Sequence, residues 1–259
     1  MVYFGLIDVM VTSSLQKNYD SFAPYYDTVV GHRHEEAVFL RRILSACAPH
    51  AATLLELGCG TGSMLKVLCR YYNATGIDRS RAMLARAKRK APKAKLIQGD
   101  ITSFGVKERF DAIICPFDTM NHLTSLTAWR KVFLNVYRHL NPAGIFVFDV
   151  NTEAKMMCYR DDPKVLLTDT CATIVEVKRT ARHRYRVSHK VFEHQRGNRF
   201  KLHEMQISEY IPATEAILSE LKPFFRRVVV IDPDRSRPSR HSHELFFVCQ
   251  GPRDGRKVS

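Results

Sequence analysis

The sequence has 259 residues, of which 45% are hydrophobic and 25% charged, a composition typical of a globular protein that excludes a disordered or fibrous one. No apolar run reaches the ~18 residues that a membrane-spanning helix needs, and the seven scattered cysteines contain no C-x-x-C pair, so neither a disulfide framework nor a zinc site is indicated. The formal net charge of +14 favours anionic partners without choosing among nucleic acid, phosphorylated metabolites, carboxylates and acidic lipids.

The first part of the chain alternates between helix and strand patterns. Residues 35–48 carry apolar side chains at helical spacing, and the apolar run at 53–57 predicts a buried strand that stops at Gly58. The same patterns then predict helices at 63–71, 80–89 and 126–140, and strands at 74–78, 95–100, 110–116 and 145–150. This alternation predicts parallel strands joined by right-handed crossovers in a doubly wound sheet.

Beyond residue 150 the periodicity changes. Segments 165–179, 184–195 and 199–211 are rich in β-branched and aromatic residues, which predicts an antiparallel meander. A helix at 213–224 and strands at 226–232 and 244–249 complete the chain. We therefore expect an α/β fold with a doubly wound, mostly parallel seven-stranded sheet and an antiparallel β lid inserted after the fifth strand.

The strongest chemical signal is the glycine-rich turn Gly58-Cys59-Gly60-Thr61-Gly62, which lies between a strand and a helix. Glycines permit a tight turn and a close approach of ligand to backbone, and the start of the following helix offers free N–H groups. Asp78 and Asp100 end the next two strands, where a carboxylate can accept hydrogen bonds from ribose hydroxyls. These features predict a nucleoside site.

Four segments together resemble class I (Rossmann-like) S-adenosylmethionine-dependent methyltransferases: 54-LLELGCGTG-62, 76-GIDRSRAMLARAK-88, 98-QGDI-101 and 110-FDAIICPFDTMNHL-123. A dinucleotide enzyme would more often show G-x-G-x-x-G. The resemblance implies S-adenosylmethionine as cofactor, S-adenosylhomocysteine as product and no metal. The cofactor-binding residues it implies are Tyr19, Tyr26, Arg33, Glu56, Gly58, Gly60, Gly62, Asp78, Arg79, Met83, Asp100, Ile101 and Phe117.

The resemblance also implies a role for each group. The three glycines line the methionyl part with Glu56 beneath it, and Asp78 holds the ribose. Met83 flanks the adenine, Asp100 accepts from its amino group, and Ile101 donates a backbone N–H to its ring.

The opening 19-YDSFAPYYDTVVGHRHEEAVFL-40 resembles the small-molecule branch of these enzymes, the glycine and amino-sugar N-methyltransferases. In that case Tyr19, Tyr26 and Arg33 form a lid over the methionine moiety, with Arg33 pairing its carboxylate. The alternative is that the tyrosines only pack a helix.

Segment 115-CPFDTMNHL-123 lies where the family places its substrate, and it lacks the N-P-P-Y or D-P-P-Y tetrad used on nucleic-acid bases or glutamine. Asp118 and Asn121 are candidate substrate-binding residues. His122 is the candidate catalytic base because its unperturbed pKa is about 6.5, although a packing role is also open. Arg184, with Arg182 and Arg186, points either toward an anionic substrate or out to solvent.

We therefore expect methyl transfer to an N or O atom of a small metabolite that can be anionic. An RNA methyltransferase and a non-catalytic cofactor-binding protein are the alternatives, nucleic acid being disfavoured because no appended RNA-binding domain is visible. The unpaired cysteines predict a cytoplasmic protein, and a monomer and a homodimer both stay open. The expected division is an arm and cofactor lid at 1–34, the core at 35–151, the β lid at 152–211 and the last helix and strands at 212–259.

Overall fold

The computed structural model describes residues 19–31, 34–168, 171–195 and 199–253. The strands of its main sheet are β1 (Thr53–Leu57), β2 (Asn73–Asp78), β3 (Lys95–Gln98), β4 (Phe110–Cys115), β5 (Leu140–Asn151), β10 (Phe225–Ile231) and β11 (Glu244–Pro252). The helices around it are α2 (His34–Cys47), α3 (Ser63–Leu68), α4 (Arg81–Lys90), α5 (Leu126–His139) and α7 (Thr214–Leu221). No helix in the described ranges is both long and apolar enough to span a membrane.

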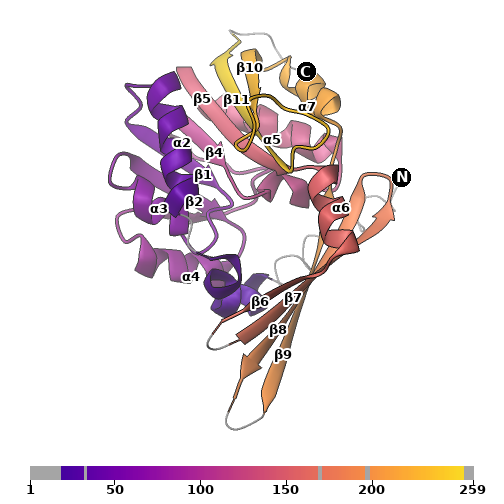
Figure 1. The fold of residues 1–259 in the computed structure, drawn as a ribbon. Helices are drawn as coiled ribbons and strands as arrows, with labels where there is room; N and C mark the ends of the chain where they lie inside the picture. The colour runs from indigo at the N-terminus through magenta and orange to yellow at the C-terminus, as the bar shows by residue number, and fades with distance from the viewer. Residues whose placement is uncertain (1–18, 32–33, 169–170, 196–198, 254–259) are drawn as a thin grey trace, which may run out of the picture.

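The main sheet has seven strands in the order β10-β11-β5-β4-β1-β2-β3 (Figure 1). Strands β1 to β5 pair in parallel, whereas β11 runs antiparallel to both β5 and β10. The prediction of a mostly parallel, doubly wound sheet with an antiparallel last strand is confirmed. The carboxyl ends of β1, β2 and β4 meet at the edge where such folds bind ligands.

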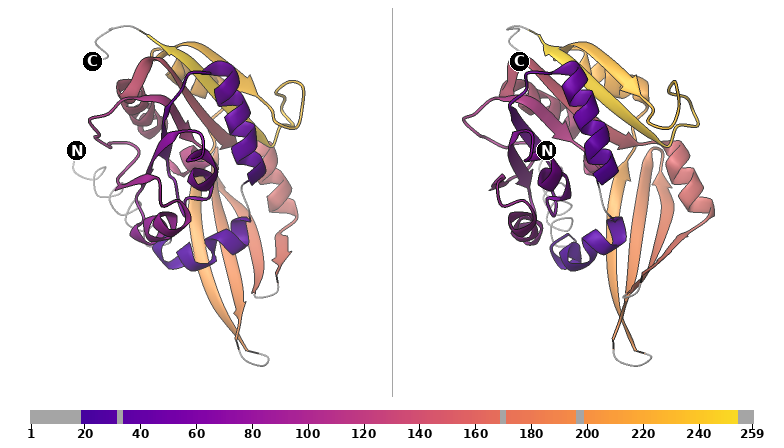
Figure 2. Two further views of the ribbon diagram at one scale, coloured as in Figure 1. Left: turned by 90° about the vertical axis from the view of Figure 1, so that its left-hand side faces the viewer. Right: turned by 60° about the vertical axis from the view of Figure 1, so that its left-hand side comes forward.

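Helices cover both faces of the sheet, and alternate residues of each strand supply the two halves of the core (Figure 2). On β5, Phe146 and Phe148 pack against α5 and α7, while Ile145 and Val147 pack on the side of α2 and α3. Strands buried on both faces read as unbroken apolar runs, which is why the sequence pattern identified them.

The segment after β5 forms a separate four-stranded antiparallel sheet, in the order β6-β7-β8-β9, which we call the lid. Its elements are α6 (Glu153–Asp161), β6 (Lys164–Leu167), β7 (Cys171–Ala181), β8 (Arg184–His194) and β9 (Phe200–Tyr210). The single strand predicted at 165–179 is two strands, β6 and β7, that pair with each other. Helix α6 was not predicted because it has no clear apolar stripe, and its start is set by Thr152, whose side chain accepts from the Lys155 N–H.

Residues 19–30 form a helix that lies between the lid and the glycine-rich turn of the main sheet (Figure 2). Phe22 on this helix is only 2% exposed and packs among lid side chains, including Val191, Met205 and Ile207. The helix thereby connects the two sheets above the carboxyl edge of β1.

Candidate active site

The turn after β1 has the backbone that its glycines predict. Gly58, Gly60 and Gly62 adopt φ angles of 72°, 51° and 77°, in the left-handed region that glycine tolerates best. A Cβ on Gly58 would lie 2.6 Å from the Thr119 side chain, and one on Gly62 would lie 2.9 Å from the Ala87 backbone. A Cβ on Gly60, by contrast, would meet only the edge of the Tyr26 ring at 4.0 Å, so Gly60 borders open space.

Two buried carboxyl groups support this turn. Glu56 is 1% exposed, and its Oε2 has no hydrogen-bond partner within the described part of the chain. Asp78 accepts hydrogen bonds from the backbone N–H groups of Gly60 and Ser80, each at 2.8 Å. Burial raises the pKa of both carboxyl groups. An unpartnered buried oxygen is costly unless a ligand donates to it, so Glu56 marks a binding site.

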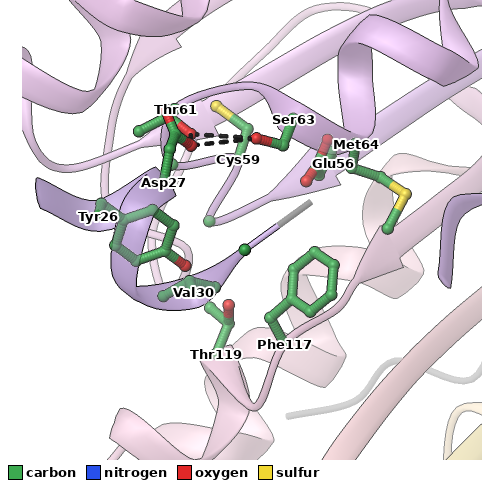
Figure 3. A pocket seen from close by; sticks show the side chains of 13 residues that line it. Tyr26, Asp27, Val30, Glu56, Cys59, Thr61, Ser63, Met64, Phe117 and Thr119 are labelled. Atoms are coloured by element: carbon green, nitrogen blue, oxygen red, sulfur yellow. Dashed lines mark hydrogen bonds between the residues drawn. The ribbon is translucent and has the colours of Figure 1, made fainter. Parts of the chain in front are cut away.

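A pocket opens above the turn (Figure 3). It is bordered by Glu56 and Gly60 from the core, by Tyr26 and Val30 from the helix of residues 19–30, and by Phe117 after β4. Figure 3 shows Tyr26, Val30 and Phe117 facing the turn from the opposite side. These three segments of the chain thus border one space.

Aspartates hold the helix of residues 19–30 against this pocket. Asp27 accepts hydrogen bonds from Thr61 Oγ1 at 2.6 Å and from Lys90 Nζ at 2.6 Å, and these bonds, with Ser63 Oγ, lower its pKa despite burial. Asp20 accepts from Ser80 Oγ at 2.5 Å at the start of α4. Sequence analysis missed both anchors because their partners lie far along the chain.

The residues assigned to the adenine lie at the ends of β2 and β3. Asp100 accepts from Arg79 Nη2 at 2.5 Å and from the backbone N–H of Thr102 at 2.8 Å, and these donors lower its pKa. Met83, on α4, and Ile101, after β3, are both buried. The contacts of Arg79, Met83, Asp100 and Ile101 with a nucleoside stay predictions.

The chain after β4 makes a strained turn. Phe117 and Asp118 have φ angles of 60° and 48°, which are unusual for residues with a Cβ. The Asp118 backbone N–H donates to Asp149 Oδ2 at 2.9 Å, and this buried carboxylate from β5 holds the turn in place. A 3-10 helix, η1 (Thr119–His122), follows directly. Strain of this kind collects at functional sites.

His122 lies beside Tyr19, whose hydroxyl is 3.1 Å from His122 Nε2. Burial lowers the pKa of His122 and raises that of Tyr19, so both are neutral near pH 7. Tyr19 and Tyr26 face each other with ring centroids 6.3 Å apart. The structure therefore brings the predicted base next to the predicted lid tyrosines.

A buried polar cluster continues from there into the lid. Asn121 Oδ1 accepts from the Asn151 backbone N–H at 2.9 Å, and Asn151 Nδ2 donates to Glu209 Oε2 at 3.2 Å. Lys155 Nζ donates to Asn151 Oδ1 at 2.7 Å. We call the following set the polar cluster: Tyr19, Asp118, Asn121, His122, Asn151, Lys155, His189 and Glu209.

Sequence analysis missed Asn151, Lys155, His189 and Glu209. A signal for two of them was present. On β8 and β9 the buried apolar residues occupy odd positions, such as Val187 and Ile207, so His189 and Glu209 share the inward face with them.

His189 should make the protein sensitive to acid. Burial lowers its pKa to about 4, below the unfolded value near 6.5. The stability that the neutral imidazole contributes is therefore complete above about pH 6.5 and is lost as the pH falls toward 4, by up to about 3 kcal/mol. We expect His189→Gln to flatten this acid limb in denaturant titrations at several pH values, whereas the same change at exposed His50 should not. An unchanged limb in His189→Gln would contradict this.

Arg184 does not join the site. Arg182, Arg184 and Arg186 are exposed, and the Arg184 guanidinium lies over the Tyr210 ring at 5.3 Å. Strand alternation places Tyr185 and Val187 inward and the arginines of β8 on the solvent face. The assignment of Arg184 to substrate binding is thus wrong, and the outward alternative holds. Arg33 lies outside the described residues.

Residues 54–144 match the family model described as "Methyltransferase domain". This segment is therefore similar to methyltransferase domains. It contains the glycine-rich turn, Asp78, Asp100 and the strained turn after β4.

Several known proteins resemble the chain. A dTDP-3-amino-3,6-dideoxy-α-D-glucopyranose N,N-dimethyltransferase of Streptomyces fradiae is 33% identical over 117 residues, covering 45% of this chain and 46% of that protein. A malonyl-[acyl-carrier protein] O-methyltransferase of Priestia megaterium is 30% identical over 142 residues, covering 52% and 50%. The fold resembles the crystal structure of an S-adenosylmethionine-dependent methyltransferase from Clostridium acetobutylicum, with a TM-score of 0.75, 21% identity and coverage of 90% and 98%.

The chain spans about half the length of the curated relatives it matches, between 46% and 59%. The structural match to the Clostridium acetobutylicum enzyme extends over most of both chains, so it includes more than the methyltransferase domain. At 21% identity that likeness establishes the fold alone.

Proposed function

We propose that the protein transfers a methyl group from S-adenosylmethionine to a nitrogen atom of a small metabolite. The observation that carries this proposal is the pocket above Gly60, whose border residue Phe117 is followed directly by Asp118 of the polar cluster. The polar cluster also contains the buried carboxyl group of Glu209. The methyltransferase domain, and the resemblance of the chain to named methyltransferases, support the reaction type.

The residues present fit S-adenosylmethionine. Glu56 offers a buried acceptor without a partner, Gly60 borders open space, and Asp78 lies at the end of β2 where a ribose would sit. When bound, the cofactor supplies a methyl group already activated by its sulfonium charge. The chain then has to hold a nucleophile in line, exclude water and manage the nucleophile's proton.

The polar cluster favours a substrate nitrogen over an anionic group. Asp118 and Glu209 bring carboxyl groups to it, and the arginines once considered for an anion face solvent. An ammonium group bound here would be stabilised by the charge of Asp118 and would favour the ionised form of Glu209, which an anionic group would not. The resemblance to the amino-sugar N,N-dimethyltransferase of Streptomyces fradiae also supports a nitrogen acceptor. The resemblance to the O-methyltransferase of Priestia megaterium supports an oxygen acceptor instead, so both amines and alcohols have to be tested as substrates.

Asp78→Ala tests the cofactor pocket. Losing hydrogen bonds to a charged group costs about 1.5–3 kcal/mol, so we expect the dissociation constant of S-adenosylhomocysteine to rise about 10-fold to 150-fold in calorimetry. Asp111→Ala is the matched control, because Asp111 accepts from Thr53 and Asn141 at the opposite end of the strands. Unchanged affinity in Asp78→Ala would refute the assignment. Incubation with amine and alcohol panels, followed by mass spectrometry for methylated products, then tests the reaction.

RNA methylation is the second candidate, and a basic cleft favours it. Lys66, Arg70, Lys90 and Lys93 line a cleft where the ends of α3 and α4 meet, away from the polar cluster. Phosphate contacts would make RNA affinity fall steeply with salt. Salt-dependent binding together with a methylated RNA product would favour RNA over a small metabolite. The homodimer, the cytoplasmic location and the four-part division of the chain stay predictions.

A further inference from the structure

Glu209 occupies an unusual position for a carboxyl group. It is 5% exposed, on the inward face of β9 in line with Met205 and Ile207, while Glu204, Gln206 and Ser208 on the other face are exposed. Burying a carboxyl group among apolar neighbours is costly, and a lid strand would be more stable with another aliphatic residue there.

The partner that Glu209 has in the protein is an amide and not a cation. Its Oε2 accepts from Asn151 Nδ2 at 3.2 Å, and Lys155 donates to the Oδ1 of the same amide at 2.7 Å. Asn151 thus stands between the lysine and the carboxyl group. A buried ion pair is the usual way of stabilising such a carboxylate, and among the residues that the structure describes Glu209 makes none.

The groups near Glu209 come from several elements. They are Tyr19 on the helix of residues 19–30, Asp118 after β4, Asn151 on β5 and Lys155 on α6. On β8 the residue paired with Glu209 is Tyr185, and His189 lies opposite Met205. Burial, and then the charge of Asp118, raise the pKa of Glu209 to about 8. Since burial keeps His122 and His189 neutral near pH 7, Lys155 is the positive charge of the polar cluster.

We propose that Glu209 binds the ammonium form of the substrate amine and accepts its proton, so that the lid supplies the catalytic base of the reaction. This inference rests on the proposed function and deepens it. In the step, one N–H bond of the ammonium breaks, its electron pair stays on nitrogen, and the proton forms an O–H bond on Glu209. The neutral amine then carries the lone pair that methyl transfer requires.

Glu209 should make the site discriminate between a substrate amine and an alcohol of the same shape. A protonated Glu209 in the empty protein releases its proton to solvent when an ammonium group binds beside it, because the new positive charge favours the carboxylate. An alcohol of the same shape brings no charge and triggers no release. Proton release on binding therefore separates a glutamate that pairs with the substrate ammonium from a merely structural one.

The test compares Glu209→Gln with Glu204→Gln, a matched change on the exposed face of the same strand. The probes are 3-amino-3-deoxyglucose and glucose, each titrated by calorimetry at pH 7 into protein saturated with S-adenosylhomocysteine, in two buffers of different ionisation heat. We expect the wild type and Glu204→Gln to bind the amine at least about tenfold more tightly than the alcohol, with release of about one proton. Glu209→Gln should lose both the preference and the release.

The outcomes are distinct. A wild type that does not prefer the amine, or a Glu209→Gln variant that keeps the preference and the proton release, overturns the role of Glu209. Binding of S-adenosylhomocysteine is measured first in all three proteins. If the wild type does not bind it, the proposed function itself fails. If only Glu209→Gln loses it, Glu209 supports the fold, and its assignment as a base is overturned.

Discussion

Gly62→Ala is expected to raise the dissociation constant of S-adenosylhomocysteine on the order of 100-fold and to lower the free energy of unfolding by about 2–5 kcal/mol. Gly62 has a φ of 77°, and an added Cβ would lie 2.9 Å from the Ala87 backbone. Because backbone atoms of α4 cannot rotate away as a side chain would, α4 has to shift. That helix carries Met83, and its first turn is linked to Asp78 through Ser80.

Gly251→Ala is the control that introduces similar backbone strain away from the pocket. Gly251 has a φ of 62°, but an added Cβ would meet only the Arg226 side chain at 3.5 Å, and the residue lies on β11. The alanine would be strained in the left-handed region, so the free energy of unfolding of this variant should fall by about 1–2 kcal/mol. Its affinity for S-adenosylhomocysteine should stay unchanged. Calorimetry and denaturant unfolding on both variants check the prediction. Wild-type affinity in Gly62→Ala would show that the turn tolerates a side chain and that α4 does not wall the pocket.

Phe22→Ala should detach the helix of residues 19–30 from the lid. Removing a buried phenylalanine ring costs about 3–5 kcal/mol, and a helix this short is marginal without tertiary contacts. Tyr26 and Val30 of this helix border the pocket. We therefore expect affinity for S-adenosylhomocysteine to fall on the order of 100-fold and protease cleavage within residues 19–30 to accelerate.

The unfolding midpoint of the main sheet should hardly move in Phe22→Ala, because Phe22 packs in a cluster separate from the two that line the sheet. Phe247→Ala is the complementary control. Its ring stacks on Phe148 with centroids 4.9 Å apart, so its loss should lower the midpoint and spare ligand affinity measured well below it. Full affinity in Phe22→Ala would mean that Asp20 and Asp27 alone hold the helix in place.

Local sequence patterns were enough to predict the sheet and the glycine-rich side of the pocket. Both depend on local patterns: buried parallel strands are apolar throughout, and the turn from Gly58 to Gly62 needs φ angles that favour glycine. Asp78 and Phe117 follow from their place at strand ends. These signals lie within a few residues of one another, so no knowledge of distant contacts is required.

Only the tertiary structure decided which groups lie opposite that pocket. Glu209 meets Asn151 across 58 positions, and Asp27 meets Lys90 across 63, and no local pattern encodes such pairs. The outward direction of the arginines near Arg184 also depends on tertiary contacts. Alternation along a strand fixes which residues share a face, but packing against a neighbouring element decides which face turns inward. The same choice of face turned Glu209 toward Asp118 and left Arg182, Arg184 and Arg186 in solvent.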